Sequence, residues 1–96
     1  MSLDVFKSEN TGNEEPLISF SLSELDLLEP ANIKLKESTG LFIDAFRDTR
    51  LSSSHAKIFA SKGLEITSPK DYALRDKLNK LNKIAEQTSM LFFEGD

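Results

Sequence analysis

The sequence predicts an all-α protein, an antiparallel and coiled-coil-like helical hairpin over residues 30–96 with a flexible N-terminal segment. Two long segments, residues 31–62 and 69–93, carry helical patterns, and only a short polar connection separates them. A connection this short makes neighbouring helices fold back on each other. Residues 1–16 are acidic and rich in turn formers, so we expect a disordered tail there.

Residues 17–29 are expected to form a docking segment. Ile18, Phe20 and Leu22 alternate with serines, which is the period of a half-buried strand. A Ser-x-x-Asp start at Ser23, followed by leucines, predicts a short helix. The strand either docks on the helices of this chain or adds to the sheet edge of another protein. Of these two interpretations we favour a local cap over the chain's own helices.

The first long helix is expected over residues 31–62, ended by Gly63 in the left-handed conformation. Gly40 is its weak point, because a glycine inside a helix costs about 1 kcal/mol relative to alanine. We favour an unbroken helix. The alternative that stays open is a short helix that closes at Gly40, followed by a new helix that starts near Leu41. One face of this segment carries a line of apolar residues: Ile43, Leu51 and Ile58.

The second helix, over residues 69–93, has the clearest local signals. Ser68 suits the N-cap, and Pro69 suits the first helical position. Apolar and small residues then recur at alternating spacings of four and three, which is the seam of a helix packed lengthwise on another. With a turn near residue 65, Leu78 is expected opposite Ser53. The partner-binding residues predicted on this helix are Leu74, Leu78, Leu81, Ile84 and Phe92.

Two helices leave apolar surface uncovered, because a hairpin buries only one stripe of each. The apolar line of Ile43, Leu51 and Ile58 would lie outside that contact, so it predicts self-association or a dedicated partner helix. The alternative is that residues 17–28 fold back and cover this surface.

One helical stripe carries four possible metal ligands: Glu37, Asp44, Asp48 and His55. Carboxylate metal sites in helical bundles draw on several helices and a Glu-x-x-His pair, which this chain lacks. A solvated polar face is the better interpretation. The serines beside His55 do not form a triad with it, because helical neighbours point about 100 degrees apart. We therefore expect no enzyme activity, no metal, no cofactor and no small-molecule substrate.

Composition bears on partners and location. The formal net charge is −4, and the lysines of the last helix alternate with asparagines rather than aromatics, so nucleic-acid binding is not expected. No apolar run approaches the roughly 18 residues that span a bilayer, so membrane insertion is not expected either.

The chain has no cysteine, which fits a reducing compartment. The N-terminus also lacks a signal-peptide pattern. We expect a cytoplasmic protein.

Residues 66–74, Ile-Thr-Ser-Pro-Lys-Asp-Tyr-Ala-Leu, followed by the leucine seam, resemble the small helical-hairpin proteins of bacterial type III secretion systems. Needle and inner-rod subunits and their co-chaperones share a disordered N-terminus, a first helix, a proline-containing turn and a final amphipathic helix. The resemblance covers residues 63–93. Because rod and needle subunits continue through a further apolar turn that polymerises, the resemblance implies a co-chaperone or adaptor rather than a filament subunit.

Two functions are expected. The first is a non-catalytic protein–protein interaction subunit of a larger assembly, such as a type III secretion component or co-chaperone. The second is a small regulatory binding protein, an inhibitor or adaptor, that docks through residues 17–28.

Overall fold

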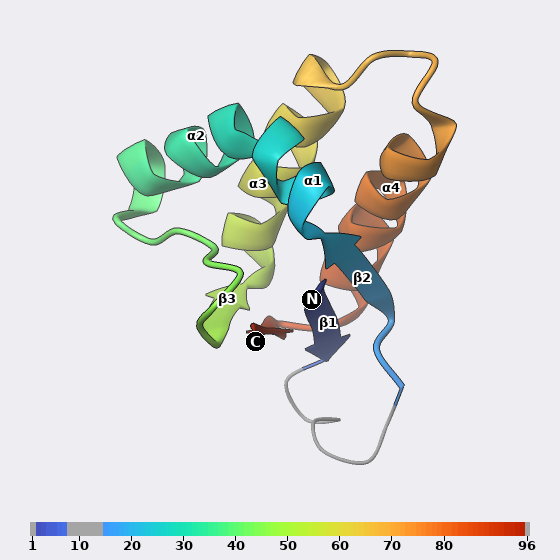
Figure 1. Cartoon of the computed structure of the whole chain (residues 1–96). Coiled ribbons are helices and arrows are strands. Elements are labelled where there is room, and N and C mark those ends of the chain that lie inside the picture. Colours follow the sequence, from blue (N-terminus) through green and yellow to red (C-terminus); the bar gives the residue numbers. More distant parts are fainter. Residues whose placement is uncertain (1, 8–14, 96) are drawn as a thin grey trace.

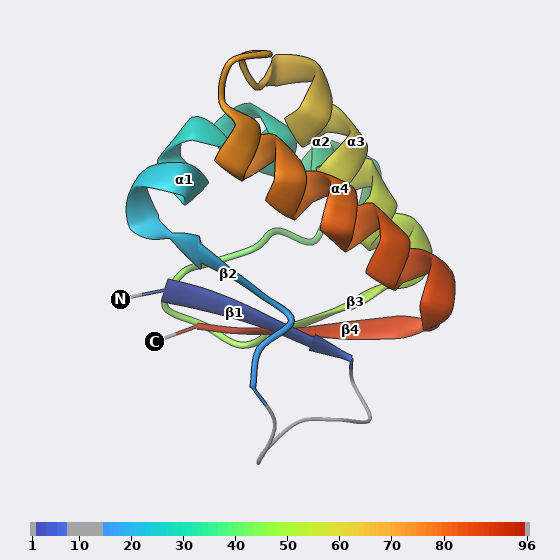
Figure 2. The same ribbon diagram turned by 90° about the vertical axis from the view of Figure 1, so that its right-hand side faces the viewer.

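The computed structural model describes residues 2–7 and 15–95. Strands and helices follow one another in the order β1 (Ser2–Lys7), β2 (Ile18–Ser21), α1 (Leu22–Leu27), α2 (Glu29–Thr39), β3 (Thr49–Ser52), α3 (Ser53–Ile66), α4 (Tyr72–Gln87) and β4 (Met90–Glu94). The strands form an antiparallel sheet in the order β2-β1-β4-β3, and the helices lie over one face of it (Figures 1 and 2). The expected all-α helical hairpin is therefore wrong, and the fold is mixed α/β.

The N-terminal strand β1 lies inside the sheet, between β2 and β4. Its Leu3 and Val5 are fully buried, and Ser2 and Asp4 before them are partly exposed, as in a strand with one face on a core. The disorder expected over residues 1–16 is therefore wrong for Ser2–Lys7. The part of that tail at residues 8–14 lies outside the described residues.

Strand β4 takes the place of the last turns expected for the second helix. Thr88 is extended and ends α4, after which the chain returns along β1 and β3. Leu91 and Phe93 are fully buried and belong to the core beneath the helices. Phe92 points to the opposite face, because neighbouring strand residues alternate, and it pairs there with Phe6 at 6.4 Å between ring centroids.

The long first helix is also wrong. The alternative is correct in that a short helix closes at Gly40, but wrong in that no new helix starts near Leu41, and the next helix begins at Ser53. Gly40 has φ 78° and closes α2 in the left-handed conformation. An irregular connection over residues 41–48 and strand β3 then separate α2 from α3. Gly63 does not end a helix, since α3 continues to Ile66.

Gly63 instead provides close contact between helices. A Cβ placed on it would lie 3.0 Å from a methyl group of Leu78 and 3.1 Å from one of Leu28. Leu78 thus packs against Gly63 and not opposite Ser53, because the turn between α3 and α4 comes later in the chain than expected.

The docking segment contains a strand and a short helix, as expected, but Leu22 begins the helix α1 and is not part of the strand. Ile18 and Phe20 form β2 with β1 and are buried, so the strand belongs to this chain's own sheet. The short helix α1 follows, with its N-cap at Ser21 in place of the expected Ser23.

The leucine seam of α4 forms this chain's own core and not a coiled coil. Five apolar residues of α4 are buried: Leu74, Leu78, Leu81, Ile84 and Ala85. They join one cluster with the inward residues of all four strands, including Phe20, Leu51 and Phe93. Among the described residues, no helix is both long enough and apolar enough to cross a membrane.

Candidate protein-binding groove

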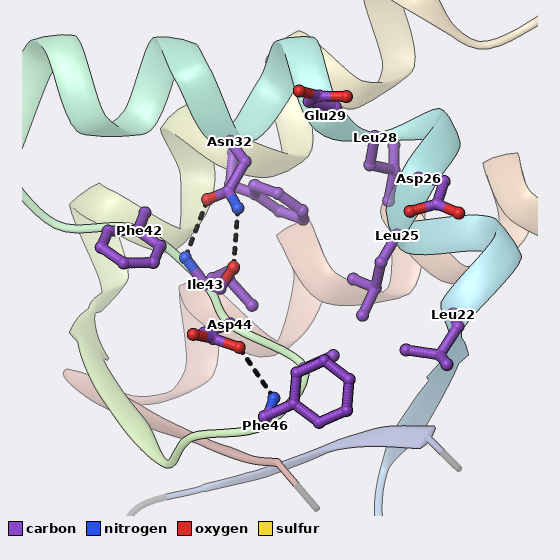
Figure 3. A pocket seen from close by; sticks show the side chains of 12 residues that line it. Leu22, Leu25, Asp26, Leu28, Glu29, Asn32, Phe42, Ile43, Asp44 and Phe46 are labelled. Carbon is purple, nitrogen blue, oxygen red and sulfur yellow. Dashed lines mark hydrogen bonds between the residues drawn. The ribbon is translucent and has the colours of Figure 1, made fainter.

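A groove of about 290 Å³ opens between α1, the start of α2 and the connection that follows Gly40 (Figure 3). We call it the α1–α2 groove. It is lined by Leu22, Leu25, Asp26, Leu28, Glu29, Asn32, Phe42, Ile43, Asp44, Ala45, Phe46 and Phe59.

The floor of the groove is apolar and its edge carries exposed apolar side chains. Leu28 and Phe59 are almost fully buried beneath it. Phe42 and Phe46 are 42% and 59% exposed, and Leu22 is 36% exposed. Large apolar side chains gathered around one hollow mark a surface where another molecule gains by covering them.

The wall formed by residues 41–48 is fixed from two sides. The Asn32 side chain bonds both the N–H and the carbonyl of Ile43, as Figure 3 shows. The Phe46 N–H then donates to the Asp44 carboxylate over 2.8 Å, which turns the chain and exposes the Phe46 ring. A wall with these hydrogen bonds is preorganised, so less ordering is required when a ligand binds.

The end of β4 supports this wall from behind. Gly95 approaches it so closely that a Cβ would lie 2.5 Å from the backbone nitrogen and oxygen of Arg47. The Gly95 N–H also donates to the Asp48 carboxylate over 3.1 Å.

The opposite wall, α1, is held by a capping box and an ion pair. Ser21 accepts from the Glu24 N–H while the Glu24 carboxylate accepts from the Ser21 N–H. Lys77 of α4 also donates to this carboxylate over 2.7 Å. Burial alone would raise the pKa of Glu24, but the hydrogen bonds from Lys77 and Ser21 and the charge of Lys77 outweigh burial, so the pKa lies below its ordinary 4.5.

The charged groups of the lining are all acidic. Asp26, Glu29 and Asp44 supply carboxylates, and none of the twelve described lining residues is basic. Arg47 approaches Asp44 to 3.9 Å, but its side chain is 78% exposed, so this pair is weak. Lys36 stands 5.5 Å from the centroid of the Phe42 ring, outside the lining.

Two of the predicted partner-binding residues, Leu22 and Ile43, lie together in this groove. Ile58 is half-buried and borders a separate hollow with three lysines: Lys34, Lys57 and Lys62. The others are buried in the protein itself, and a role for them at a partner surface stays a prediction: Leu74, Leu78, Leu81, Ile84, Phe92, Leu51, Ile18 and Phe20.

Phe42, Phe46 and Asp26 were missed as site residues. The unbroken helix expected over residues 31–62 placed both phenylalanines inside a helix. The left-handed glycine before them was the available signal, because a helix that closes at Gly40 places them in an exposed connection.

The four possible metal ligands, which we interpreted as a solvated polar face, are divided among different elements. Glu37 lies on α2, Asp44 and Asp48 lie in the connection, and His55 lies on α3. Across residues 2–7 and 15–95, no group of three or more His, Cys, Asp or Glu side chains is arranged to hold a metal ion.

The resemblance to type III secretion proteins implied an all-α helical hairpin, and the observed fold is mixed α/β instead. A relationship to those proteins stays a prediction. No protein-family model, curated protein or solved structure shows significant similarity to this chain.

Proposed function

We propose that the protein is a small, non-catalytic regulatory binding protein of the cytoplasm, an adaptor or inhibitor, that recognises a protein partner through the α1–α2 groove. One observation carries this proposal. Leu22, Phe42 and Phe46 stand exposed around a single apolar floor. Interfaces are enriched in aromatic side chains, and their strongest contacts are apolar anchors seated in pockets.

The groove is a fixed surface, which supports recognition of a partner segment. Ile43 is held to α2 by two hydrogen bonds, and α1 is held to α4 by the Glu24–Lys77 pair. A preformed site binds with a smaller entropy loss than a mobile one.

The alternative expected from the sequence, docking through residues 17–28, is retained in part. Leu22 and Asp26 of that segment line the groove. Ile18 and Phe20 pack inside the protein, so they are not included in the proposed contact surface.

A random peptide library displayed on phage tests the proposal with the full chain as bait. The groove variant is F42S/F46S, and the control is Tyr72→Ser, which removes a more exposed aromatic ring from the start of α4. These three rings lie at the surface and outside the buried core, so each variant is expected to fold, and circular dichroism checks this.

The expected result is a set of peptides that bind the wild type and the Tyr72→Ser control but not the groove variant. The proposal fails if no peptide is enriched, or if every enriched peptide binds the groove variant as well as the wild type.

A further inference from the structure

We infer that the partner segment is basic, and that it carries a lysine or arginine beside the apolar residue that enters the α1–α2 groove. This inference rests on the proposed function and specifies the chemistry of the ligand.

The first support is the sign of the charge around the groove. Asp26, Glu29 and Asp44 all belong to the lining, and none of the twelve described lining residues is basic. An apolar hollow with negatively charged carboxylates at its edge favours a positively charged partner.

The second support is that two of these carboxylates have no partner. Within residues 2–7 and 15–95, the side chains of Asp26 and Glu29 form no hydrogen bond or ion pair, and both residues are exposed. Asp44 differs, because its carboxylate accepts from the Phe46 N–H and lies near Arg47. Asp26 and Glu29 are therefore the groups available to an incoming cation.

The third support concerns the bases of the chain itself. Lys36 is not part of the groove lining but borders a neighbouring hollow with Glu29 and Phe42, and Arg47 approaches Asp44. Among the described residues, neither base forms an ion pair with Asp26 or Glu29. The end of the groove formed by α1 and the start of α2 thus keeps its negative charge. An acidic partner segment would place like charges together there, which selects against it.

The test reads the sequences of the peptides whose binding depends on Phe42 and Phe46. The inference predicts that lysine and arginine are enriched next to a leucine or aromatic residue in these peptides. The strongest of them is then titrated, as a labelled synthetic peptide, against D26N/E29Q. The matched control is D76N/E86Q, which removes the same charge from exposed positions on α4.

D26N/E29Q should weaken binding about fivefold at low salt and reduce its salt dependence, because two exposed charge pairs are lost. The control should leave affinity within about twofold, since its charges lie outside the groove. Charge reversal, D26K/E29K, should weaken binding further and favour acidic peptides.

The possible results separate this inference from the proposed function. Groove-dependent peptides without basic enrichment, or with equal affinity for wild type and D26N/E29Q, would overturn the inference and leave the proposed function standing. A dimer that F42S/F46S abolishes, seen by sedimentation, would also overturn it, because the occupant would be a second copy. A complete lack of groove-dependent peptides would remove the proposed function itself.

Discussion

The side-chain amide of Asn32 holds the backbone of Ile43 through two hydrogen bonds. Its Nδ2 donates to the Ile43 carbonyl over 2.6 Å, and the Ile43 N–H donates to its Oδ1 over 2.8 Å. Ile43 is buried and lies outside the helices and strands, so its N–H and carbonyl lack the partners that regular secondary structure provides. The Asn32 amide satisfies both of these backbone groups. The Asn32 side chain is therefore one of the groups that fix this wall of the groove.

Asn32→Ala should lower the free energy of unfolding by about 1–3 kcal/mol, because both backbone groups of Ile43 lose their partner. Urea unfolding measures this loss, and amide exchange should show faster exchange at Ile43. Asn79→Ala, at an exposed position on α4, is the control. Unchanged protection of the Ile43 amide in Asn32→Ala would contradict this account of the wall.

Gly95→Ala should displace the end of β4 from the groove wall. The new Cβ would meet the backbone of Arg47 at 2.5 Å and the carbonyl of Ala45 at 2.7 Å, and backbone cannot move aside as a flexible side chain does. Overpacking of this kind costs about 1–3 kcal/mol. Chemical unfolding gives the cost, and NMR shifts at residues 44–48 should report the displacement.

Gly40→Asn is the comparison for this substitution. Gly40 has φ 78° but open space around a Cβ, and asparagine tolerates the left-handed conformation. We expect Gly40→Asn to be the milder change. A Gly95→Ala protein as stable as the wild type, with unshifted resonances at residues 44–48, would show that the close approach is not retained in solution.

Local patterns predicted local structure correctly. The alternation around Ile18 and Phe20 predicted the strand β2, and the seam from Leu74 to Ala85 predicted the apolar face of α4. The start of α4 was displaced, since Asp71 and not Ser68 is its N-cap. Such shifts are usual because several capping residues stand close together there.

Non-local pairing could not be predicted in the same way. The sheet joins the two ends of the chain, with Val5 opposite Phe93 and Phe6 opposite Phe92. The consecutive apolar residues Leu91–Phe93 fit a buried strand or the end of a buried helix equally well. The strand β1, which pairs with these residues, is short and is followed by a polar stretch in the sequence. We therefore expected it to belong to the disordered N-terminal tail.

The candidate groove was predicted only in part for the same reason. Leu22 and Ile43 were expected at a partner surface, and both line the groove. Phe42 and Phe46 were not, because their position depends on the break at Gly40 and on the hydrogen bonds that Asn32 makes across the chain. The periodicity of apolar residues along the sequence does not reveal such long-range contacts.

Gly63→Leu tests the close contact between α3 and α4. Leucine favours helices over glycine by about 1 kcal/mol, yet its side chain would enter space filled by the methyl groups of Leu78 and Leu28. We expect a net loss of about 1–3 kcal/mol in unfolding free energy. Ser61→Leu, at an exposed position of the same helix, is the control and should be nearly neutral. A stabilised Gly63→Leu protein would mean that the helices can separate there without cost.

Glu24→Gln should remove a pH-dependent part of the stability that fixes α1. Burial acts to raise the pKa of Glu24, but Lys77 and Ser21 outweigh burial, so the folded pKa lies below 4.5. The unfolded chain therefore binds this proton more readily than the folded chain. The stabilisation is complete above the unfolded value and is lost as the pH falls through the folded pKa. The loss should be modest, because Lys77 is partly exposed and solvent weakens the pair.

Urea unfolding of the wild type and Glu24→Gln between pH 7 and pH 3 measures this effect. The wild type should be more stable at pH 7, because the glutamine keeps an acceptor for the Ser21 N–H but loses the charge that Lys77 meets over 2.7 Å. The difference should shrink once the pH falls below 4.5, as the wild-type carboxylate gains its proton. Glu86→Gln, at an exposed position of α4, controls for the change in net charge. A wild-type advantage that stays constant down to pH 3 would show that the carboxylate's charge does not hold α1 against α4.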